Sequence, residues 1–446
     1  MRKWLPLAAA CLGSFMFLVD TTVVTVALPD MARGLPASLQ SLQWVANVYT
    51  LVLAVLMLTA GSIADIYGHR DTYVGGLIAF GAASLLCGLA PDAGTLIAAR
   101  ALQGIGGAAL AVTTFALVAG SYDGKDRGTA MGVFFAVTGL AAAVGPMLGG
   151  VLTAGFGWRA IFFVNLPLVA FTVVLALRSL SNVRHDRGTQ PDRGAQRGRS
   201  TQQDRRARLD PLGMITFALA AGSLTYALTA GVRGWYIVAA GGLAAFVMVE
   251  RRRDSPLLDL RLFARPAFST VMLCAMAGSV SFACLVYTSI HLQSGEGMGP
   301  VRAGLAMTPL ALASFLTSTV GGRFLHGVSP RLTVGIGLLA GGLGCALQAW
   351  SLAPGLVVTG IGVGIAGPSM GAAVMASAPK ERGGMAAGAM TTFRQLGQTL
   401  GVAVLGVVYQ SESGLDGVHL TAGAIGLATG ALAVAVIRRA PAPGVA

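Results

Sequence analysis

Fourteen stretches of this chain are long and apolar enough to cross a lipid bilayer as α-helices. Backbone amides and carbonyls inside a bilayer have no water to bond, so a spanning segment of this kind is expected to be helical. The sequence therefore predicts an all-α integral membrane protein. The approximate limits of the stretches are 4–29, 41–63, 72–90, 95–121, 129–154, 159–178, 211–231, 234–250, 267–292, 302–325, 332–351, 354–378, 384–410 and 417–438.

Composition and charge agree with a membrane protein and argue against a nucleic-acid partner. Only 11% of the residues are charged, whereas a soluble domain has about 25%. The chain has 31 Lys and Arg residues, and 25 of them fall in cytoplasmic loops if the N-terminus is cytoplasmic. Arg33, Arg159, Arg233 and Arg302 then fall outside, and Arg100 and Arg394 lie within spans. The sequence predicts that both termini are cytoplasmic. The excess of Arg over Lys favours a GC-rich bacterium, so we expect a multi-pass protein of a bacterial cytoplasmic membrane, surrounded by lipid.

A polar linker rich in Arg, Gly and Gln divides the spans into six, two and six. Halves of equal span count are typical of transporters whose substrate site lies between the halves. The predicted units are an N-terminal six-helix half (1–178), a basic cytoplasmic linker (179–210), an inserted two-helix hairpin (211–250), a cytoplasmic loop (251–266), a C-terminal six-helix half (267–438) and a cytoplasmic tail (439–446).

Two of these units have open roles. The linker lacks apolar periodicity, so we expect it to be disordered or loosely bound at the membrane surface. It either attracts anionic lipid headgroups or serves as a tether that enforces topology. The two inserted helices are expected to form a hairpin, because only 232–234 connects them, and to fill the groove between the halves on the lipid side.

Asp20 is the only acidic residue deep in any predicted span. A charge at that depth costs roughly 2.5–3.5 kcal/mol on insertion scales, so it usually has a partner and a function. Arg100, in the fourth span, needs a counter-charge for the same reason, and it shares a helical face with Gln103. We expect Asp20 to be the partner of Arg100, with Asp65 as the alternative. A purely structural acid, satisfied by Arg100 or by helix-end carbonyls, is the competing interpretation of Asp20.

Three motifs carry a resemblance to a known family. Gly61, Asp65, Gly68 and Arg70 form a GxxxDxxGxR loop whose opposite charges can latch it to a neighbouring helix end. This pattern resembles the signature loop of the major facilitator superfamily, although Ile66 stands where a basic residue is usual. The RxxQG run at Arg100 resembles the fourth-helix motif of that family, in which the arginine is linked to proton transfer.

The third motif lies in the fifth span, where a GxxxG pattern predicts close helix contact and a proline predicts a kink. It resembles the antiporter motif of drug/proton antiporters in the superfamily, which the symporters typically lack. Its residues are Gly139, Gly145, Pro146, Gly149 and Gly150.

Further runs narrow the resemblance to the fourteen-span drug/proton antiporters. They are 18–29 (with Thr25 where Asn is usual), 44–49, 158–167 and 382–397. The resemblance implies the major facilitator fold and a functional monomer. It also implies export of amphipathic small molecules, such as drugs or antibiotics, in exchange for protons. The proton gradient then drives transport and no cofactor is expected. Asp20 and Arg100 are the expected proton-coupling residues.

The substrate site is expected between the halves near the middle of the membrane. Tyr49 is equally suited to packing, Trp44 to an interfacial aromatic belt, and His291 to an outer-edge polar position. No acid lies deep in the last six spans. Members of the family that export divalent cations carry an additional membrane acid, so the resemblance favours a neutral or monovalent substrate. The candidate substrate residues are Trp44, Asn47, Tyr49, Gln103, Tyr287, His291 and Gln293.

Other functions compete with drug export. An ion-coupled symporter or a narrow-specificity metabolite exporter would share the same fold. An enzyme is disfavoured, because the chain has no Walker loop, HExxH or GxSxG motif. A receptor or scaffold would leave Asp20 and Arg100 without a role. The 5 cysteines are far apart in apolar stretches, so we expect packing roles for them and no metal site.

Overall fold

The computed structural model describes residues 2–35, 37–122, 124–180, 210–253, 258–324, 328–378 and 383–437. Throughout these ranges the regular structure is helical, as predicted, and contains no strand. Disorder is predicted for the linker, of which residues 181–209 lie outside the described ranges. The cytoplasmic tail also lies outside them. The side chain of Asp65 also lies outside the described part of the chain.

The first half comprises α1 to α7, preceded by a short 3₁₀ turn, η1 (Arg2–Trp4). Its helices are α1 (Leu5–Gly34), α2 (Leu39–Tyr67), α3 (His69–Leu89), α4 (Ala93–Ser121), α5 (Gly124–Phe156), α6 (Ala160–Phe163) and α7 (Asn165–Ser179). The sixth predicted span is thus divided into α6 and α7, with Val164 between them.

The inserted hairpin comprises α9 (Pro211–Ala230) and α10 (Gly234–Arg252), and the second half comprises α11 to α16. The remaining elements are η2 (Leu260–Ala264), α11 (Pro266–Ile290), the π turn η3 (His291–Gly295), α12 (Pro300–Phe324), α13 (Pro330–Leu347), α14 (Leu352–Ser377), α15 (Gly383–Tyr409) and α16 (Gly414–Val436).

Every one of the fourteen predicted stretches is helical in the structure. Among the described residues, 11 helical segments are long and apolar enough to cross a membrane. The helices α5, α10 and α15 are not among these segments. The total of fourteen spans therefore stays a prediction.

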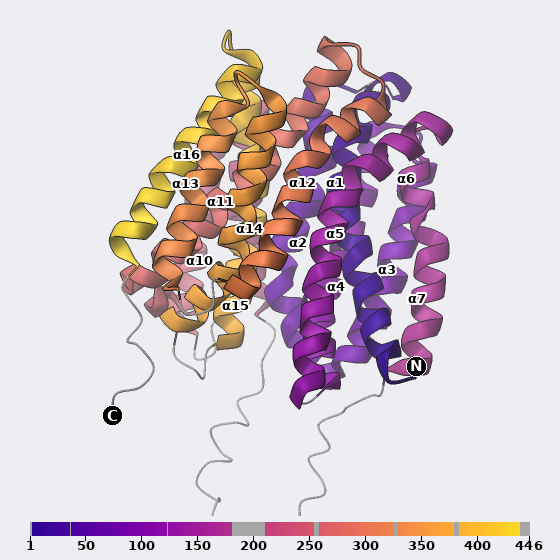
Figure 1. The fold of residues 1–446 in the computed structure, drawn as a ribbon, viewed down its shortest axis with the longest axis vertical. Helices are drawn as coiled ribbons and strands as arrows, with labels where there is room; N and C mark the ends of the chain where they lie inside the picture. Colours follow the sequence, from indigo (N-terminus) through magenta and orange to yellow (C-terminus); the bar gives the residue numbers. More distant parts are fainter. Residues whose placement is uncertain are drawn as a thin grey trace, which may run out of the picture.

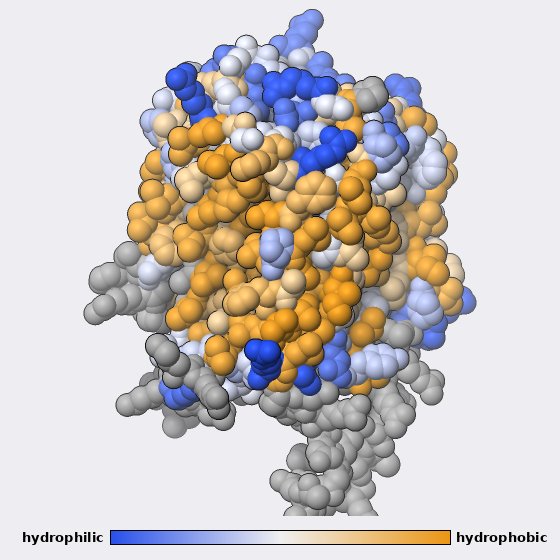
Figure 2. All heavy atoms as spheres, turned by 90° about the vertical axis from the view of Figure 1, so that its right-hand side faces the viewer, coloured by the Kyte–Doolittle hydropathy of each residue, from blue (hydrophilic) through white to orange (hydrophobic). Residues whose placement is uncertain are grey.

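The two halves stand side by side, with α1 to α7 on one side and α11 to α16 on the other (Figure 1). We call the end where α1 begins and α16 finishes the terminal end, and the opposite end the distal end. The first and last helices of the bundle thus begin and finish at the same end of the molecule. Seen from the side of the first half, a broad apolar belt lies between hydrophilic ends (Figure 2).

Local signals place the ends of several helices. Gly68 has φ 98°, a backbone conformation that favours glycine, and it both terminates α2 and precedes α3. Asp92 caps α4, because its carboxylate accepts hydrogen bonds from the backbone N–H and the hydroxyl of Thr95 at 2.9 Å each. These bonds favour the ionised form and lower the pKa of Asp92 below its usual value.

A large apolar cluster joins the halves at the distal end. It combines side chains of α1 and α2, such as Val24 and Leu42, with side chains of α11 and α15, such as Tyr287 and Leu405. We call it the inter-half cluster. The backbones of α5 and α12 also touch there, because Gly150 lies against Pro300. The structure is therefore closed at the distal end.

The hairpin covers the seam between α2 and α15. Ala221 of α9 packs in one cluster with Leu51 and Ala54 of α2 and Leu396 of α15. Near the distal end, the Tyr226 ring of α9 lies 6.1 Å from the ring of Trp44 on α2. This position agrees with the expectation that the hairpin fills the groove between the halves.

Candidate functional site

Asp20 on α1 and Arg100 on α4 form a buried ion pair. Each residue is 1% exposed, and Nη1 of Arg100 bonds to Oδ2 of Asp20. The predicted pairing with Asp20 is therefore confirmed. Burial removes the hydration of both charges, a cost of several kcal/mol per ion that only good geometry and further hydrogen bonds offset.

The guanidinium of Arg100 is held on all sides. Nη1 also donates to Oε1 of Gln103 at 2.6 Å, and Nε donates to the carbonyl of Val45 at 3.2 Å. The Tyr49 ring lies 4.3 Å from the guanidinium carbon, within the range of a cation–π contact. Residues from α2 and α4 thus fix the position of the cation.

The second carboxylate oxygen of Asp20 is also hydrogen-bonded. Gln103 Nε2 donates to it at 2.9 Å, and Asn165 Nδ2, at the start of α7, donates at 3.5 Å. Both amides in turn donate to the hydroxyl of Ser84 on α3, at 2.9 and 3.3 Å. Side chains of α1, α3, α4 and α7 therefore form one hydrogen-bond network around this carboxylate. We call Asp20, Ser84, Arg100, Gln103 and Asn165 the acid cluster.

The acid cluster contains residues that sequence reasoning did not assign to the site. Asn165 stands in a run that resembles the antiporters, but no contact was expected for it. Ser84 received no role, although its spacing from Phe80 and Leu77 places it on the buried face of α3. A small polar residue on an otherwise apolar buried face was the available signal.

The second half holds an uncharged counterpart of the acid cluster. The Cys345 thiol donates to the Ser281 hydroxyl at 3.5 Å, and the Thr359 hydroxyl donates to the Cys345 sulfur at 3.8 Å. Counted from the start of each helix, the matched positions are Ser281 of α11 with Asp20 of α1, Cys345 of α13 with Ser84 of α3, and Thr359 of α14 with Arg100 of α4. Of the two clusters, only the first contains an acid and a base.

The predicted latch loop joins α3 to α7. Nη2 of Arg70 donates to the carbonyl of Leu177, in the last turn of α7, at 3.0 Å. A cation there also suits the negative end of the helix dipole. Gly61 faces Val112 of α4 at an ordinary packing distance. Arg70 thus attaches the loop to a helix end, as expected of a latch, whereas the contribution of Asp65 lies outside the described part of the chain.

The antiporter motif lies where α5 meets α1 and α12. A Cβ on Gly145 would collide with Thr22 of α1, and one on Gly149 would lie 2.8 Å from the carbonyl of Val23. Pro146 is inside α5, and its carbonyl touches Gly304 of α12. The motif therefore provides close approach between helices, on one side within the first half and on the other between the halves. The surroundings of Gly139 are outside the described residues.

Three of the candidate substrate residues do not line the space between the halves. Tyr49 is fully buried in the first half, because it packs over Arg100 and donates to the carbonyl of Phe17 at 3.4 Å. Gln103 belongs to the acid cluster. Trp44 packs on Tyr226 of the hairpin. These contacts favour a packing role for Tyr49, and a part of the three residues in substrate binding stays a prediction.

The other candidates lie near the junction of the halves, but in closed contacts. Tyr287 accepts a hydrogen bond from Gln43 Nε2 at 3.0 Å and donates to the carbonyl of Val402. Gln293 Nε2 donates to the carbonyl of Val26 on α1 at 2.8 Å. The bonds of Tyr287 with Gln43 and of Gln293 with Val26 connect the two halves near the distal end.

Asn47 and His291 complete the set of candidates. Asn47 is fully buried on α2, and neither atom of its amide has a hydrogen-bond partner within the described structure. His291 is half-buried at the start of η3, toward the distal end. Among the described residues, no contact links His291 to the acid cluster.

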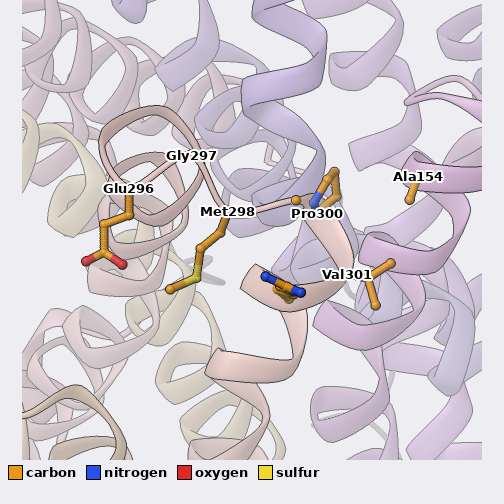
Figure 3. Close-up of a pocket in the computed structure, with 8 residues that line it drawn as sticks. Ala154, Glu296, Gly297, Met298, Pro300 and Val301 are labelled. Carbon is orange, nitrogen blue, oxygen red and sulfur yellow. The ribbon is translucent and has the colours of Figure 1, made fainter.

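A cavity of about 570 Å³ opens at the distal end, beside the loop between η3 and α12. Glu296 and Met298 line it from the loop, and Ala154 of α5 lies across from Pro300 and Val301 (Figure 3). None of the predicted substrate residues lines this cavity. Its position at the rim distinguishes it from the site expected at mid-membrane.

The chain is similar to known transporters over nearly its whole length. It matches the Major Facilitator Superfamily over residues 10–401 and again over 267–446. It is 34% identical over 423 residues to the multidrug resistance protein Stp of Mycobacterium tuberculosis, covering 91% of this chain and 75% of that protein. It is 33% identical over 443 residues to a probable actinorhodin transporter of Streptomyces coelicolor, covering 92% and 72%.

The fold is that of a solved transporter. The crystal structure of a peptide transporter POT in complex with sulfate superposes with a TM-score of 0.72, at 14% identity, covering 97% of this chain and 94% of that one. This likeness concerns the fold, whereas the family rests on the matches in sequence. The chain belongs to the major facilitator superfamily, and it is a multi-pass transport protein of the bacterial plasma membrane rather than an enzyme.

Proposed function

We propose that this protein exports amphipathic small molecules in exchange for protons, and that Asp20 carries the proton. The observation that carries this proposal is the acid cluster, in which the mid-span carboxylate of Asp20 on α1 is bound by groups from α4 and α7, and a hydroxyl of α3 accepts from two of those groups. The names of the relatives, a multidrug resistance protein and an antibiotic transporter among them, support drug efflux.

The cluster suits a group that gains and loses a proton. The carboxylate of Asp20 accepts hydrogen bonds from Arg100 and Gln103. Protonation would remove the charge that Arg100 pairs with, so the contact between α1 and α4 would change with it. Rocking of the two halves would then alternate the exposure of the site.

The finer features of the proposal follow the fourteen-span antiporters. The proposal includes fourteen spans, cytoplasmic termini, a functional monomer within the lipid bilayer and a proton gradient as the energy source. The terminal end is cytoplasmic in this arrangement. The closed distal end then gives the structure an inward-facing state, ready to receive substrate from the cytoplasm.

The test uses inverted membrane vesicles energised to an acidic lumen and monitored with a pH-sensitive dye. A panel of lipophilic cations, neutral antibiotics and organic anions is added to vesicles of wild type and of Asp20→Asn. We expect substrates to release lumen protons through the wild type only, because the amide cannot exchange a proton. Insertion is checked by the amount of protein in washed membranes.

Two results would overturn the proposal. Proton release by Asp20→Asn equal to that of wild type would remove Asp20 from the proton path. Accumulation of a panel compound that is insensitive to an uncoupler would exclude proton exchange altogether.

A further inference from the structure

Arg394 stands in the middle of α15. By helical rise it lies roughly 17 Å from the start of the helix at Gly383 and roughly 23 Å from its end at Tyr409. Long basic side chains near helix ends reach the membrane surface, but from this depth neither surface is within reach. The side chain is nevertheless exposed in the structure. It must therefore face an open surface inside the bundle or the lipid.

The stripe of α15 that carries Arg394 faces the first half. Gln398, Val402 and Leu405 follow Arg394 at helical spacing, so the four side chains share one face. Val402 is 2% and Leu405 0% exposed, and both belong to the inter-half cluster. Gln398 is half-buried and Arg394 exposed. The side chains of the stripe are thus buried in the closed junction at Leu405 and become more exposed toward Arg394 and the terminal end.

The remaining faces of α15 are occupied by other neighbours. Gly397 lies against the backbone of Met276 on α11, and Leu396 packs in the cluster with α2 and α9. Val407, which is 53% exposed, marks the outward face and lies roughly opposite Arg394 around the helix. The Arg394 side chain therefore faces the space between the halves and not the lipid.

Arg394 also lacks a counter-charge. In the described ranges no acidic side chain pairs with it, and it makes no hydrogen bond, whereas Arg100 has an acid and three further contacts. Asp20, the only acid deep in a span, is already bound by Arg100. A charge within a span that has no partner is costly and marks a functional site. The guanidinium is free to bind an anion that enters between the halves.

We propose that Arg394, assisted by Gln398, is the anion-recognition point of this inter-half surface, and that the exported substrates are amphipathic molecules with one anionic oxygen group. This substrate class rests on the proposed efflux function and narrows it. A guanidinium presents parallel N–H donors that match two oxygens of one anionic group. The Gln398 amide, one turn further into the bundle, adds a donor, and the apolar stripe beyond it suits the rest of an amphipathic molecule.

The first experiment measures binding without transport. The full chain in lipid nanodiscs is treated with phenylglyoxal, and modification of each arginine is followed by peptide mass spectrometry. The probes are naphthalene-2-sulfonate and anthraquinone-2-sulfonate, with their neutral sulfonamides as matched controls. We expect the sulfonates to slow modification of Arg394 about tenfold, and the sulfonamides to leave it unchanged. Arg261, exposed on η2, serves as the internal reference.

The second experiment measures uptake of the same labelled probes into inverted vesicles with an acidic lumen. The sulfonates are permanently charged, so they do not cross the bilayer or dissipate the pH gradient as weak acids do. We expect Arg394→Gln to lower sulfonate uptake about tenfold while sulfonamide uptake stays at the wild-type level. Arg394→Lys should keep part of the sulfonate uptake, because it restores the charge but not the paired donors.

The outcomes separate the two proposals. Absence of Arg394 protection by either sulfonate, or equal sulfonate uptake by wild type and Arg394→Gln, overturns the anion site. If proton-coupled export of neutral or cationic compounds persists in that case, the efflux proposal stands. Protection of Arg394 by sulfonates combined with uptake that ignores the proton gradient would retain the anion site and overturn proton exchange.

Discussion

At the scale of single residues, the acid cluster is a set of mutually dependent groups. Arg100 is fully enclosed, and its charge is balanced by one carboxylate, Asp20. Removing one member of a buried pair leaves the other charge without compensation, which costs more than the pair itself contributes. The two charges are therefore expected to behave as a unit in stability measurements.

Replacing Arg100 by Gln tests this dependence. We expect Arg100→Gln to destabilise the protein by about 3–5 kcal/mol, because Asp20 is left as an unpaired buried charge. The double variant Asp20→Asn, Arg100→Gln should recover most of that loss, since neither position then carries a charge. Thermal unfolding in one detergent, for all variants and the wild type, gives the comparison. A double variant as unstable as the single one would contradict it.

The sequence predicted this ion pair from the scarcity of charged residues within the spans. A chain with one deep acid and few deep bases leaves little choice of partner. The other members of the cluster could not be predicted in the same way. Asn165 reaches Asp20, and Ser84 reaches the amides of Asn165 and Gln103, only because α3, α4 and α7 pack together around α1, and the sequence does not say which residue a polar side chain meets across the bundle.

At the scale of elements, the close packing of α5 on α1 depends on glycines, which have no side chain. Gly149 lies so close to α1 that a Cβ would come within 2.8 Å of the Val23 carbonyl. Backbone cannot yield as a flexible side chain does, so α1 and α5 would have to separate. Gly155, in the same helix, has nothing within 4 Å of its ideal Cβ position.

The two glycines make a matched pair for mutation. We expect Gly149→Ala to destabilise the protein by about 1–3 kcal/mol through overpacking. Gly155→Ala should be neutral or stabilising by up to about 1 kcal/mol, because alanine favours the helix. The readout is the thermal unfolding midpoint of both variants under the same conditions. Equal effects at the two positions would mean that close packing of α5 on α1 is unimportant.

The sixth span shows what prediction of elements missed. The sequence placed one continuous helix over 159–178, whereas the structure divides it at Val164. Pro167 has no N–H to donate to the carbonyl four residues earlier, at Phe163, so the helix is interrupted there. The interruption has a consequence for the site, because Asn165 begins α7 and points its amide at the acid cluster.

At the scale of the whole molecule, polar contacts of α2 with α11 and across the seam between α2 and α15 hold the halves together. The hydroxyls of Thr50 and Thr399 are 2.7 Å apart, and Gln43 bonds to Tyr287 nearer the distal end. Asn47 lies between these two contacts on α2 and has no partner in the described structure. An alternating-access cycle has to break these bonds when the distal end opens.

A cross-link across this seam should stop transport. In the double variant Thr50→Cys, Thr399→Cys, the short distance between the hydroxyls places the sulfurs within reach of a disulfide. We expect oxidation to abolish substrate uptake into vesicles and reduction to restore it, because the halves can no longer separate. Each single cysteine variant is the control for oxidation of the 5 native cysteines, which are all buried. Undiminished uptake by the cross-linked protein would contradict rocking at this seam.

The sequence by itself determined the helical class, the approximate position of every helix, the two-helix insertion and the Asp20–Arg100 pair. Each of these follows from local or exclusive signals, namely long apolar runs, turn glycines, a short connection, and charges too few in the spans to have other partners. Only the tertiary structure decided which polar side chains face one another across the bundle. It turned Tyr49 and Gln103 toward Arg100, closed Tyr287 and Gln293 into the junction of the halves, and left Arg394 open between them. In helices that are apolar on nearly every side, hydrophobic periodicity is too weak to orient a face, so packing between helices determines it.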